Sequence, residues 1–316
     1  MKVSVIIPVY NESEILSELV TTLFRTLQDQ SYSWEILFID DGSSDGSFQQ
    51  LKSIAEENPE HIIVIALRRN FGQTAAIAAG IDHANGDVLV LMDADMQNDP
   101  TDIPLLLKKI DEGYDVVSGW RVNRKDNKIT RVLPSRIANK LISWVTGVHL
   151  HDYGCSLKAY RKDILADFRL YGEMHRFIPA YAANVGAKIA EVGVKHHRRK
   201  FGKTSYGMER TLKVVLDLFT VKFLISYSQK PLYLFGGLGL FLLLGGIGIL
   251  LFLLIRRLGL GISPFSSPLF PTSIMIVVMG FQSILMGLIA ELLVRTYHEA
   301  QDKPTYTIRE KINEEK

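Results

Sequence analysis

The stretch Gly86–Pro100, GDVLVLMDADMQNDP, decides the fold prediction. Its apolar run, Val88–Met92, is short and nearly continuous, which is typical of a buried strand in a parallel sheet. Asp93 and Asp95 follow this run, and ligands of open α/β sheets bind beyond the carboxyl ends of the strands. Because alternate residues of an extended chain point the same way, we expect both carboxylates to face one ligand.

These two acids, together with Gln97, predict a site for a divalent metal. Neighbouring carboxylates repel each other, and Mg²⁺ or Mn²⁺ held by one or two carboxylates plus substrate phosphates relieves that repulsion. Gln97 would add a neutral oxygen ligand. The alternative is an Asp-rich turn that caps the helix after Pro100. The rest of the chain favours the metal.

Strands and helices alternate from Val3 to Ser118. This alternation predicts a Rossmann-like α/β domain with a mostly parallel sheet. A dinucleotide site is not expected, because no G-x-G-x-x-G follows the first strand. The expected strands are Val3–Val9, Glu35–Ile39, His61–Ala66, Val88–Met92 and Asp115–Ser118.

Polar clusters also follow the first two expected strands. Asp40 and Asp41 precede Ser43 and Ser44, which are themselves available to cap the next helix, so the two acids favour ligand binding over capping. We expect five residues to hold the base and ribose of a nucleotide: Pro8, Tyr10, Glu12, Asp40 and Asp41.

Two long stretches without charge, Leu232–Ile255 and Leu269–Ala290, predict a transmembrane hairpin, since about 20 apolar residues span a bilayer. Basic residues are more numerous outside the hairpin than in its link, which predicts cytoplasmic termini. Met208–Ser226 is expected to lie in the membrane interface, with a third span as the alternative. Cys155 is the only cysteine, so a reducing compartment is expected, and no signal peptide is expected.

Basic residues in the second half of the first domain predict contacts with phosphate oxygens. The net charge of +2 neither favours nor excludes nucleic acid, and no nucleic-acid partner is expected. Arg131–Val145 predicts a basic amphipathic helix that lies on a membrane or packs as an ordinary surface helix. His196–Lys203 could equally be a solvated strand end attracted to anionic lipid. The candidate phosphate ligands are Arg121, Arg124, Arg131, Arg136, Arg198, Arg199, Lys200 and Lys203.

Four motifs in order resemble the inverting A-type-fold glycosyltransferases: VSVIIPVYNE, FIDDGSSDGS, RRNFGQTAAIAAG and LMDADMQNDP. The resemblance is narrower to the polyprenyl-phosphate group, which includes dolichol-phosphate mannose synthases and bacterial undecaprenyl-phosphate glucosyltransferases. It covers roughly residues 1–210, and the apolar hairpin is similar to that of the bacterial branch.

This resemblance implies roles for particular residues. Asp40 and Asp41 would bind the nucleotide, and Asp93, Asp95 and Gln97 the metal. The family's Arg-x-x-x-Ser and R-x-x-G-x-S-K motifs correspond to the residues expected to bind the acceptor phosphate: Arg131 and Ser135, then Arg199 and Lys203, with Arg121 beside them. Where the family's loop ends in lysine this chain has Ser205, and Lys203 is the candidate replacement.

We therefore expect an A-type-fold (GT-A) domain over 1–207, an interfacial helix over 208–228, and a two-span hairpin with a cytoplasmic tail over 229–316. The expected reaction is inverting transfer of a hexose, namely glucose from UDP-glucose, to undecaprenyl phosphate at the cytoplasmic membrane. Asp95 and Asp152 are the expected catalytic acids. Asp152 would act directly, bind sugar hydroxyls, orient an arginine or serve only as a structural hydrogen-bonding group.

Three alternatives to this function stay open. The first is the same chemistry with mannose or an aminosugar. The second is a processive polysaccharide synthase, which would carry a Q-x-x-R-W motif that is absent after Asp152. The third is a membrane scaffold without activity, which would not need to retain Asp93, Asp95 and Gln97.

Overall fold

The computed structural model describes residues 1–122, 139–140, 142–144, 146–165, 170, 174–198, 231–300 and 305–314. The chain divides into two compact units, which are described separately. The first contains the described residues up to 198 together with 305–314, and the second contains 231–300. The borders expected at residues 207 and 228 lie outside the described residues and stay predictions.

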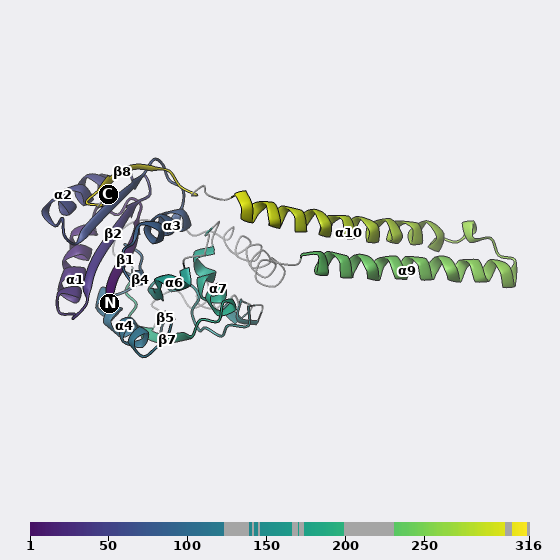
Figure 1. Cartoon of the computed structure of the whole chain (residues 1–316), viewed down its shortest axis with the longest axis horizontal. Helices are drawn as coiled ribbons and strands as arrows, with labels where there is room; N and C mark the ends of the chain where they lie inside the picture. The colour runs from purple at the N-terminus through teal and green to yellow at the C-terminus, as the bar shows by residue number, and fades with distance from the viewer. Residues whose placement is uncertain are drawn as a thin grey trace. The chain divides into compact units, whose positions relative to one another are not determined.

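The first unit alternates strands and helices as expected (Figure 1). The alternating part contains β1 (Lys2–Val9), α1 (Leu16–Gln28), β2 (Ser33–Asp40), α2 (Ser47–Glu57), β3 (Ile62–Leu67), α3 (Gln73–His83), β4 (Val88–Leu91), η1 (Pro100–Asp102), α4 (Ile103–Asp111) and β5 (Val116–Arg121). The later elements are β6 (Lys158–Arg161), α6 (Lys162–Leu165), η3 (Met174–Phe177), α7 (Ile178–Asn184), β7 (Ile189–Val194) and β8 (Ile308–Ile312).

One sheet joins all the described strands, in the order β7-β5-β6-β4-β1-β2-β3-β8. The β1–β2, β1–β4, β2–β3 and β5–β7 pairs are parallel, whereas β6 and β8 run antiparallel to their neighbours. The α/β fold class is confirmed, with a sheet that is mixed. Because β6 is antiparallel, its first residue, Lys158, pairs with Leu91 at the end of β4. Lys158 therefore lies at the sheet edge where β1, β2 and β4 end.

Helices cover both faces of the sheet, because its central strands are apolar on both sides. Val3, Val5 and Ile7 of β1 belong to the core that includes the buried faces of α1, α2 and α4. The opposite face of β1 contacts α3, where a Cβ added at Gly80 would collide with Ile6. This alanine-rich helix packs tightly on the sheet, as its composition predicts.

The last strand, β8, was not expected from the sequence. It follows the second long apolar helix and pairs antiparallel with β3, so the end of the chain completes the sheet of the first unit (Figure 1). Asn313 stabilises the position of this strand, since its side-chain amide donates hydrogen bonds to the backbone carbonyls of Ala55 (2.7 Å) and Ile62 (3.0 Å).

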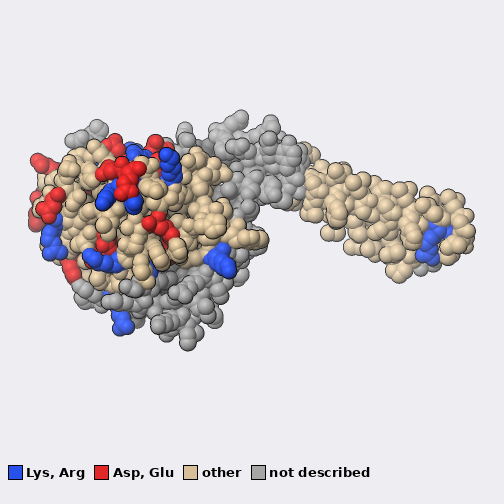
Figure 2. Space-filling model, turned by 90° about the horizontal axis from the view of Figure 1, so that it is seen from below, with Lys and Arg blue, Asp and Glu red and all other residues tan. Residues whose placement is uncertain are grey.

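The second unit is a hairpin of α9 (Pro231–Leu260) and α10 (Leu269–Ala300), with the short η4 (Pro264–Ser266) between them. Within it, Phe235–Leu260 and Leu269–Ala290 are long and apolar enough to cross a membrane. Only 17% of each span's most apolar window is buried within the protein, unlike the core helices of a soluble domain. Between 235 and 290 the only charges are Arg256 and Arg257, visible as the blue patch on the hairpin in Figure 2.

Two expected helices lie largely outside the described residues. Of Arg131–Val145, only Asn139–Lys140 and Ile142–Trp144 are described, and these are helical. The interfacial segment expected over 208–228 is not among the described residues.

Candidate active site

The loops after β1 and β2 are hydrogen-bonded to each other at the carboxyl edge of the sheet. The backbone N–H of Asn11 donates to the Ser43 hydroxyl (3.0 Å), and the Ser44 N–H donates to the Asn11 side-chain oxygen (2.8 Å). The Glu12 N–H donates to the Ser47 hydroxyl (3.0 Å). The structure thus brings together the two loops that contain the predicted nucleotide-binding residues, with Tyr10 49% exposed between them.

Asp40 and Asp41 have different surroundings in this loop pair. Asp41 accepts hydrogen bonds from the N–H groups of Phe71 (2.7 Å) and Gly72 (2.9 Å), and therefore positions the start of α3. Burial raises the pKa of Asp41, against the effect of these two hydrogen bonds. Asp40 accepts one bond from the Ser43 N–H (3.2 Å), and its buried Oδ2 has no hydrogen-bond partner among the described residues. Asp40 is thus a fully buried carboxylate at the strand end whose Oδ2 accepts no hydrogen bond from the described residues.

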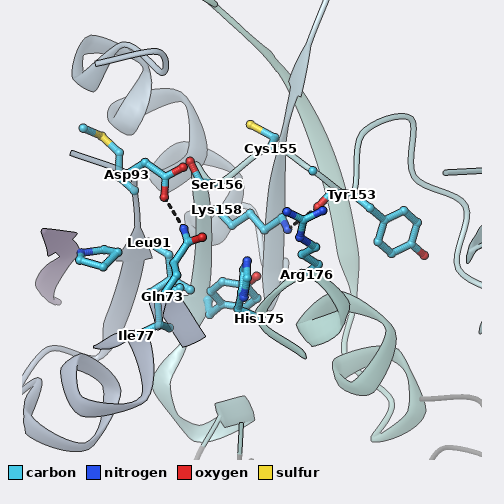
Figure 3. Close-up of a pocket in the computed structure, with 14 residues that line it drawn as sticks. Gln73, Ile77, Leu91, Asp93, Tyr153, Cys155, Ser156, Lys158, His175 and Arg176 are labelled. Atoms are coloured by element: carbon cyan, nitrogen blue, oxygen red, sulfur yellow. Dashed lines mark hydrogen bonds between the residues drawn. The ribbon is translucent and has the colours of Figure 1, made fainter. Parts of the chain in front are cut away.

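A pocket with about 510 Å³ of empty space, part of it open to solvent, lies beside Asp93 (Figure 3). The Asp93 Oδ1 accepts a hydrogen bond from the Gln73 amide (2.6 Å) at the start of α3. Burial raises the pKa of Asp93, whereas a hydrogen bond with Ser156 and the charges of Arg121, Arg176 and Lys158 oppose this rise. The lining residues are Pro8, Gln73, Ile77, Leu91, Met92, Asp93, Tyr153, Gly154, Cys155, Ser156, Lys158, Tyr160, His175 and Arg176.

Asp95 and Gln97 do not line this pocket. Asp93 and Asp95 do not lie on one extended strand as expected, because β4 ends at Leu91 and Ala94 and Asp95 form a turn. Asp95 Oδ1 instead accepts the Gln97 N–H (3.1 Å). No group of three or more His, Cys, Asp or Glu side chains suited to a metal occurs among the described residues.

Three basic residues of the pocket were not predicted from the sequence: Lys158, His175 and Arg176. Lys158 is 3% exposed and donates one hydrogen bond to the Tyr153 carbonyl (3.0 Å). Burial lowers its pKa to about 8. The half-buried His175 has its ring nitrogen Nδ1 2.7 Å from the Thr74 hydroxyl, and desolvation lowers the pKa of His175 well below the usual value. A lone lysine inside the apolar run Leu157–Tyr160 was the available signal for this site.

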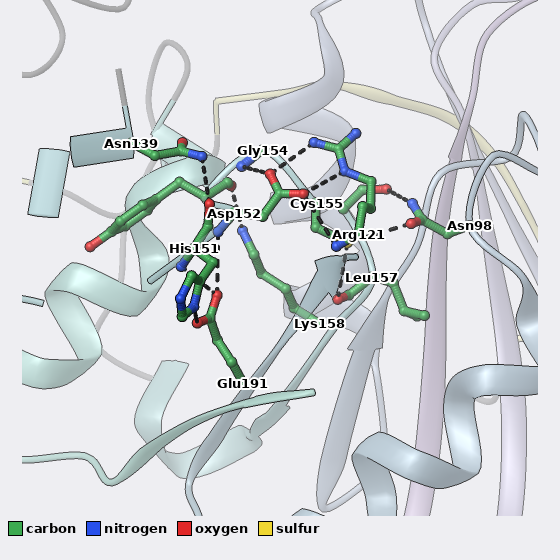
Figure 4. Close-up of polar contacts among 12 residues, drawn as sticks. Asn98, Arg121, Asn139, His151, Asp152, Gly154, Cys155, Leu157, Lys158 and Glu191 are labelled. Carbon is green, nitrogen blue, oxygen red and sulfur yellow. Dashed lines mark hydrogen bonds and ion pairs between the residues drawn. The ribbon is translucent and has the colours of Figure 1, made fainter. Parts of the chain in front are cut away.

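Asp152 forms a buried ion pair with Arg121 (Figure 4). Arg121 Nε donates to Asp152 Oδ2 (2.6 Å), and one terminal nitrogen donates to Oδ1 (2.9 Å). Oδ1 also accepts the Gly154 N–H (3.2 Å). Because both carboxylate oxygens are engaged, action of Asp152 as a base would require the pair to separate. Orientation of an arginine, one of the roles expected for Asp152, matches this geometry. Arg121 was expected to bind the acceptor phosphate, but its guanidinium is already engaged in this ion pair.

The other predicted acceptor ligands, Arg131, Ser135, Arg199 and Lys203, lie outside the described residues. Of the predicted nucleotide ligands, Pro8 lines the pocket and Glu12 belongs to the joined loops.

The mixed sheet and the acids at its edge define the fold of the A-type glycosyltransferases. Two solved structures share this fold at low sequence identity. Glucosyl-3-phosphoglycerate synthase from Mycobacterium tuberculosis, in complex with Mn²⁺ and UDP-glucose, has a TM-score of 0.52 at 16% identity over 70% of this chain and 78% of that chain. Mannosyl-3-phosphoglycerate synthase from Rubrobacter xylanophilus has a TM-score of 0.56 at 15% identity over 71% and 74%.

The chain belongs to glycosyl transferase family 2, whose model matches residues 4–169. It is 39% identical to a dodecaprenyl-phosphate galacturonate synthase from Rhizobium johnstonii, over 98% of this chain and 93% of that protein. It is also 39% identical to an undecaprenyl-phosphate 4-deoxy-4-formamido-L-arabinose transferase from Salmonella choleraesuis, over 98% and 94%. Neither relative is named for glucose. The glucosyl branch expected from the sequence is therefore not supported, and the alternative of another sugar is favoured.

Proposed function

We propose that this protein transfers a sugar from a nucleotide donor to the phosphate of a polyprenyl lipid. The observation that supports this most strongly is the 39% identity to two polyprenyl-phosphate sugar transferases, because it extends over 98% of the chain and thus includes the apolar hairpin. Membership of family 2 adds that the activity is glycosyl transfer.

The names of these two relatives limit the choice of donor sugar. Galacturonic acid and L-arabinopyranose have the same configuration at ring carbons two to four, and they differ mainly at carbon five, where one has a carboxylate and the other only hydrogen. We infer a donor sugar of this configuration in place of glucose. A nucleotide-linked galacturonic acid or 4-amino-arabinose derivative meets the requirement.

The donor would bind along the carboxyl edge of the sheet. The Asp40 Oδ2 is buried and has no hydrogen-bond partner among the described residues, so it would accept an N–H or O–H of the nucleotide once the loops beside it rearrange. The joined loops that contain Tyr10 would hold the rest of the nucleoside. Asp93, Asp95 and Gln97 offer hard oxygen ligands, and two carboxylates would suit a divalent cation whose other ligands come from a diphosphate. Because Asp95 and Gln97 do not line the pocket beside Asp93, the turn after β4 would have to rearrange to bring the three to one ion. A bound cation would supply charge neutralisation for the departing diphosphate.

The acceptor needs little acid–base help from the protein. A phosphate monoester has a second pKa of about 6, so it is mostly dianionic at neutral pH. Its oxygen can attack the anomeric carbon directly with inversion, and the protein's task is to place two anions close together. Arg131, Ser135, Arg199 and Lys203 are the proposed phosphate ligands. The Arg121–Asp152 pair would organise the adjoining loop.

We place the enzyme in the cytoplasmic membrane, anchored by α9 and α10. Arg256 and Arg257 are the only basic residues in the link of the hairpin, and the flanks outside it hold more, so both termini would be cytoplasmic.

A panel of nucleotide sugars tests the proposal. Full-length protein in detergent, with Mn²⁺ and undecaprenyl phosphate, should move label from UDP-galacturonate or a UDP-linked 4-amino-arabinose derivative into the organic phase, and much less from UDP-glucose. Asp95→Asn should abolish this transfer, whereas Asp163→Asn, an exposed acid on α6, should not. Transfer from UDP-glucose alone would overturn the sugar assignment, and no transfer from any donor would overturn the function.

A further inference from the structure

The loop His151–Ser156 forms one wall of the candidate active site. Its last four residues line the pocket beside Asp93, and the Ser156 side chain hydrogen-bonds to that carboxylate. The Ser156 hydroxyl also accepts a hydrogen bond from the Asn98 amide (2.8 Å), and Asn98 directly follows Gln97 in the sequence. The position of this loop therefore affects both the pocket and the turn that contains the predicted metal ligands.

Glu191 on β7 holds the start of this loop (Figure 4). Its Oε1 accepts hydrogen bonds from the backbone N–H groups of His151 (2.8 Å) and Asp152 (3.3 Å). Its Oε2 lies 2.8 Å from the ring nitrogen Nδ1 of His151. The Glu191 side chain is 13% exposed and is not among the described residues that line the pocket. Glu191 would therefore act on a bound substrate through the loop.

A carboxylate suits this position because two adjacent backbone N–H groups converge on one of its oxygens. A buried N–H without an acceptor is costly, and hydrogen bonds to an ionised acceptor are about twice as strong as neutral ones. The same contacts fix the backbone of Asp152, whose carboxylate pairs with Arg121 (2.6 Å). Glu191 thus determines where the Arg121–Asp152 pair lies.

A second contact reaches the loop from the segment expected to bind the acceptor. The Asn139 amide donates to the His151 carbonyl (2.8 Å). Asn139 is four residues after Ser135, which is one of the proposed ligands of the acceptor phosphate and lies outside the described residues. The loop held by Glu191 therefore connects the donor pocket with the chain segment that would hold the acceptor.

We propose that Glu191 is a positioning residue for sugar transfer, which fixes the loop His151–Ser156 so that the donor and the acceptor phosphate meet in reactive geometry. This inference rests on the proposed function and adds a residue to it. A displacement of about 1 Å caused by a mutation away from the chemistry can lower the rate about 100-fold. Nucleotide affinity should depend on Glu191 much less, because hydrogen bonds such as that from Ser44 to Asn11 hold the nucleoside loops independently.

Three substitutions of Glu191 separate the length of the side chain from its charge. Glu191→Gln keeps the length and an oxygen that can accept both N–H groups, Glu191→Asp keeps only the charge, and Glu191→Ala removes both. With full-length protein in detergent and saturating undecaprenyl phosphate, Glu191→Gln should retain most of kcat. Glu191→Asp and Glu191→Ala should lower kcat roughly 10- to 100-fold. Calorimetry with UDP and Mn²⁺ should give similar affinities for all the variants, and its stoichiometry counts the folded sites.

Asp115 provides a matched control at the opposite end of β5 from Arg121. Its Oδ2 accepts the Lys188 N–H (2.8 Å) just before β7, and its Oδ1 lies 3.6 Å from Arg161 Nε. Like Glu191, it joins a backbone N–H and a basic side chain, but it does not line the pocket. Asp115→Ala should leave kcat per folded site unchanged.

Amide hydrogen exchange tests the placement of the loop without any activity. The N–H groups of His151 and Asp152 should exchange faster in Glu191→Asp and Glu191→Ala than in the wild type, and at nearly the wild-type rate in Glu191→Gln. If Glu191→Ala does not fold, the comparison of Glu191→Asp with Glu191→Gln carries the same test.

The outcomes separate this inference from the proposed function. An unchanged kcat in Glu191→Asp, an equal loss in Glu191→Asp and Glu191→Gln, or a loss of UDP affinity as large as the loss of kcat would overturn the positioning role, while the transfer activity stands. If the wild type yields no lipid product with any donor, the proposed function fails. Hydrogen exchange then still decides whether Glu191 fixes the loop, and unchanged exchange in Glu191→Asp would overturn the inference as well.

Discussion

At the scale of single residues, the charge of Lys158 predicts a pH dependence. Burial lowers its pKa to about 8, with Arg176 and Arg121 adding to this effect and Cys155 and Asp152 opposing it. The ammonium is therefore charged below about pH 8 and neutral above it. We expect kcat/KM for the nucleotide-sugar donor to fall as the pH rises through about 8, because the pocket beside Asp93 then loses a positive charge that favours an anionic substrate. This parameter reports groups of the free enzyme.

Two variants of Lys158 test whether its ammonium is the group responsible for this pH profile. Lys158→Met, which carries no charge, should show no such fall, and Lys158→Arg should shift the fall to higher pH, since arginine stays charged. Burial raises the pKa of Cys155 to about 12, so its thiol does not titrate in this range. The same fall in Lys158→Met as in the wild type would show that Lys158 is not the group that titrates.

The sequence predicts part of this site and misses the rest for a physical reason. Asp93 and Asp40 are visible because each follows an apolar run that marks a strand end. Lys158 and Arg176 are far along the chain from both, and they reach the pocket only because β6 runs antiparallel beside β4 and η3 packs near α3. Strand direction within a sheet depends on the assembled fold, which no local pattern encodes.

At the scale of elements, β8 predicts that the end of the chain stabilises the catalytic unit. Asn313 has φ of +61° and its amide bonds two backbone carbonyls, those of Ala55 and Ile62. We expect Asn313→Ala to cost about 1–2 kcal/mol and to lower the melting temperature by roughly 2–8 °C. Asn313→Gly, which relieves the backbone strain, should recover only part of this loss.

A surface contact of the same strand provides the control. Lys52 pairs with Glu310 of β8 at 2.7 Å, and both side chains are about 40% exposed. Lys52→Ala should therefore change the melting temperature little. Circular dichroism or a thermal-shift assay in detergent measures each variant. A loss in Asn313→Ala no greater than in Lys52→Ala would contradict a structural role for β8.

The local sequence pattern predicts the first five strands well and does not predict the last one. The bounds of β1 to β5 follow from apolar runs, and the structure agrees with the expected strands within a few residues. β8, with sequence IREKI, alternates apolar and charged residues, and its pairing partner β3 is more than 200 residues away along the chain. An edge strand of this kind protects the exposed side of β3, yet it is recognisable only once the sheet is assembled.

At the scale of the whole molecule, the hairpin depends on close helix contact. A Cβ added at Gly280 of α10 would lie 2.7 Å from the Gly239 carbonyl of α9, whereas one added at Gly248 meets nothing within 4 Å. Small residues at such contacts allow membrane helices to pack. Gly280→Leu should lower the SDS fraction at which the hairpin unfolds, and Gly248→Leu should not. Equal behaviour of the two variants would rule out this packing.

In the proposed reaction a lipid phosphate displaces the nucleotide from the anomeric carbon in a single step. The configuration of the product tests this mechanism most directly. Full-length protein is incubated with α-linked UDP-galacturonate, Mn²⁺ and undecaprenyl phosphate, and the extracted lipid is examined by NMR. We expect a β-linked galacturonosyl phosphate that forms in the wild type and is absent in Asp95→Asn. An α-linked product, or galacturonic acid released into water with no lipid-linked sugar, would contradict it.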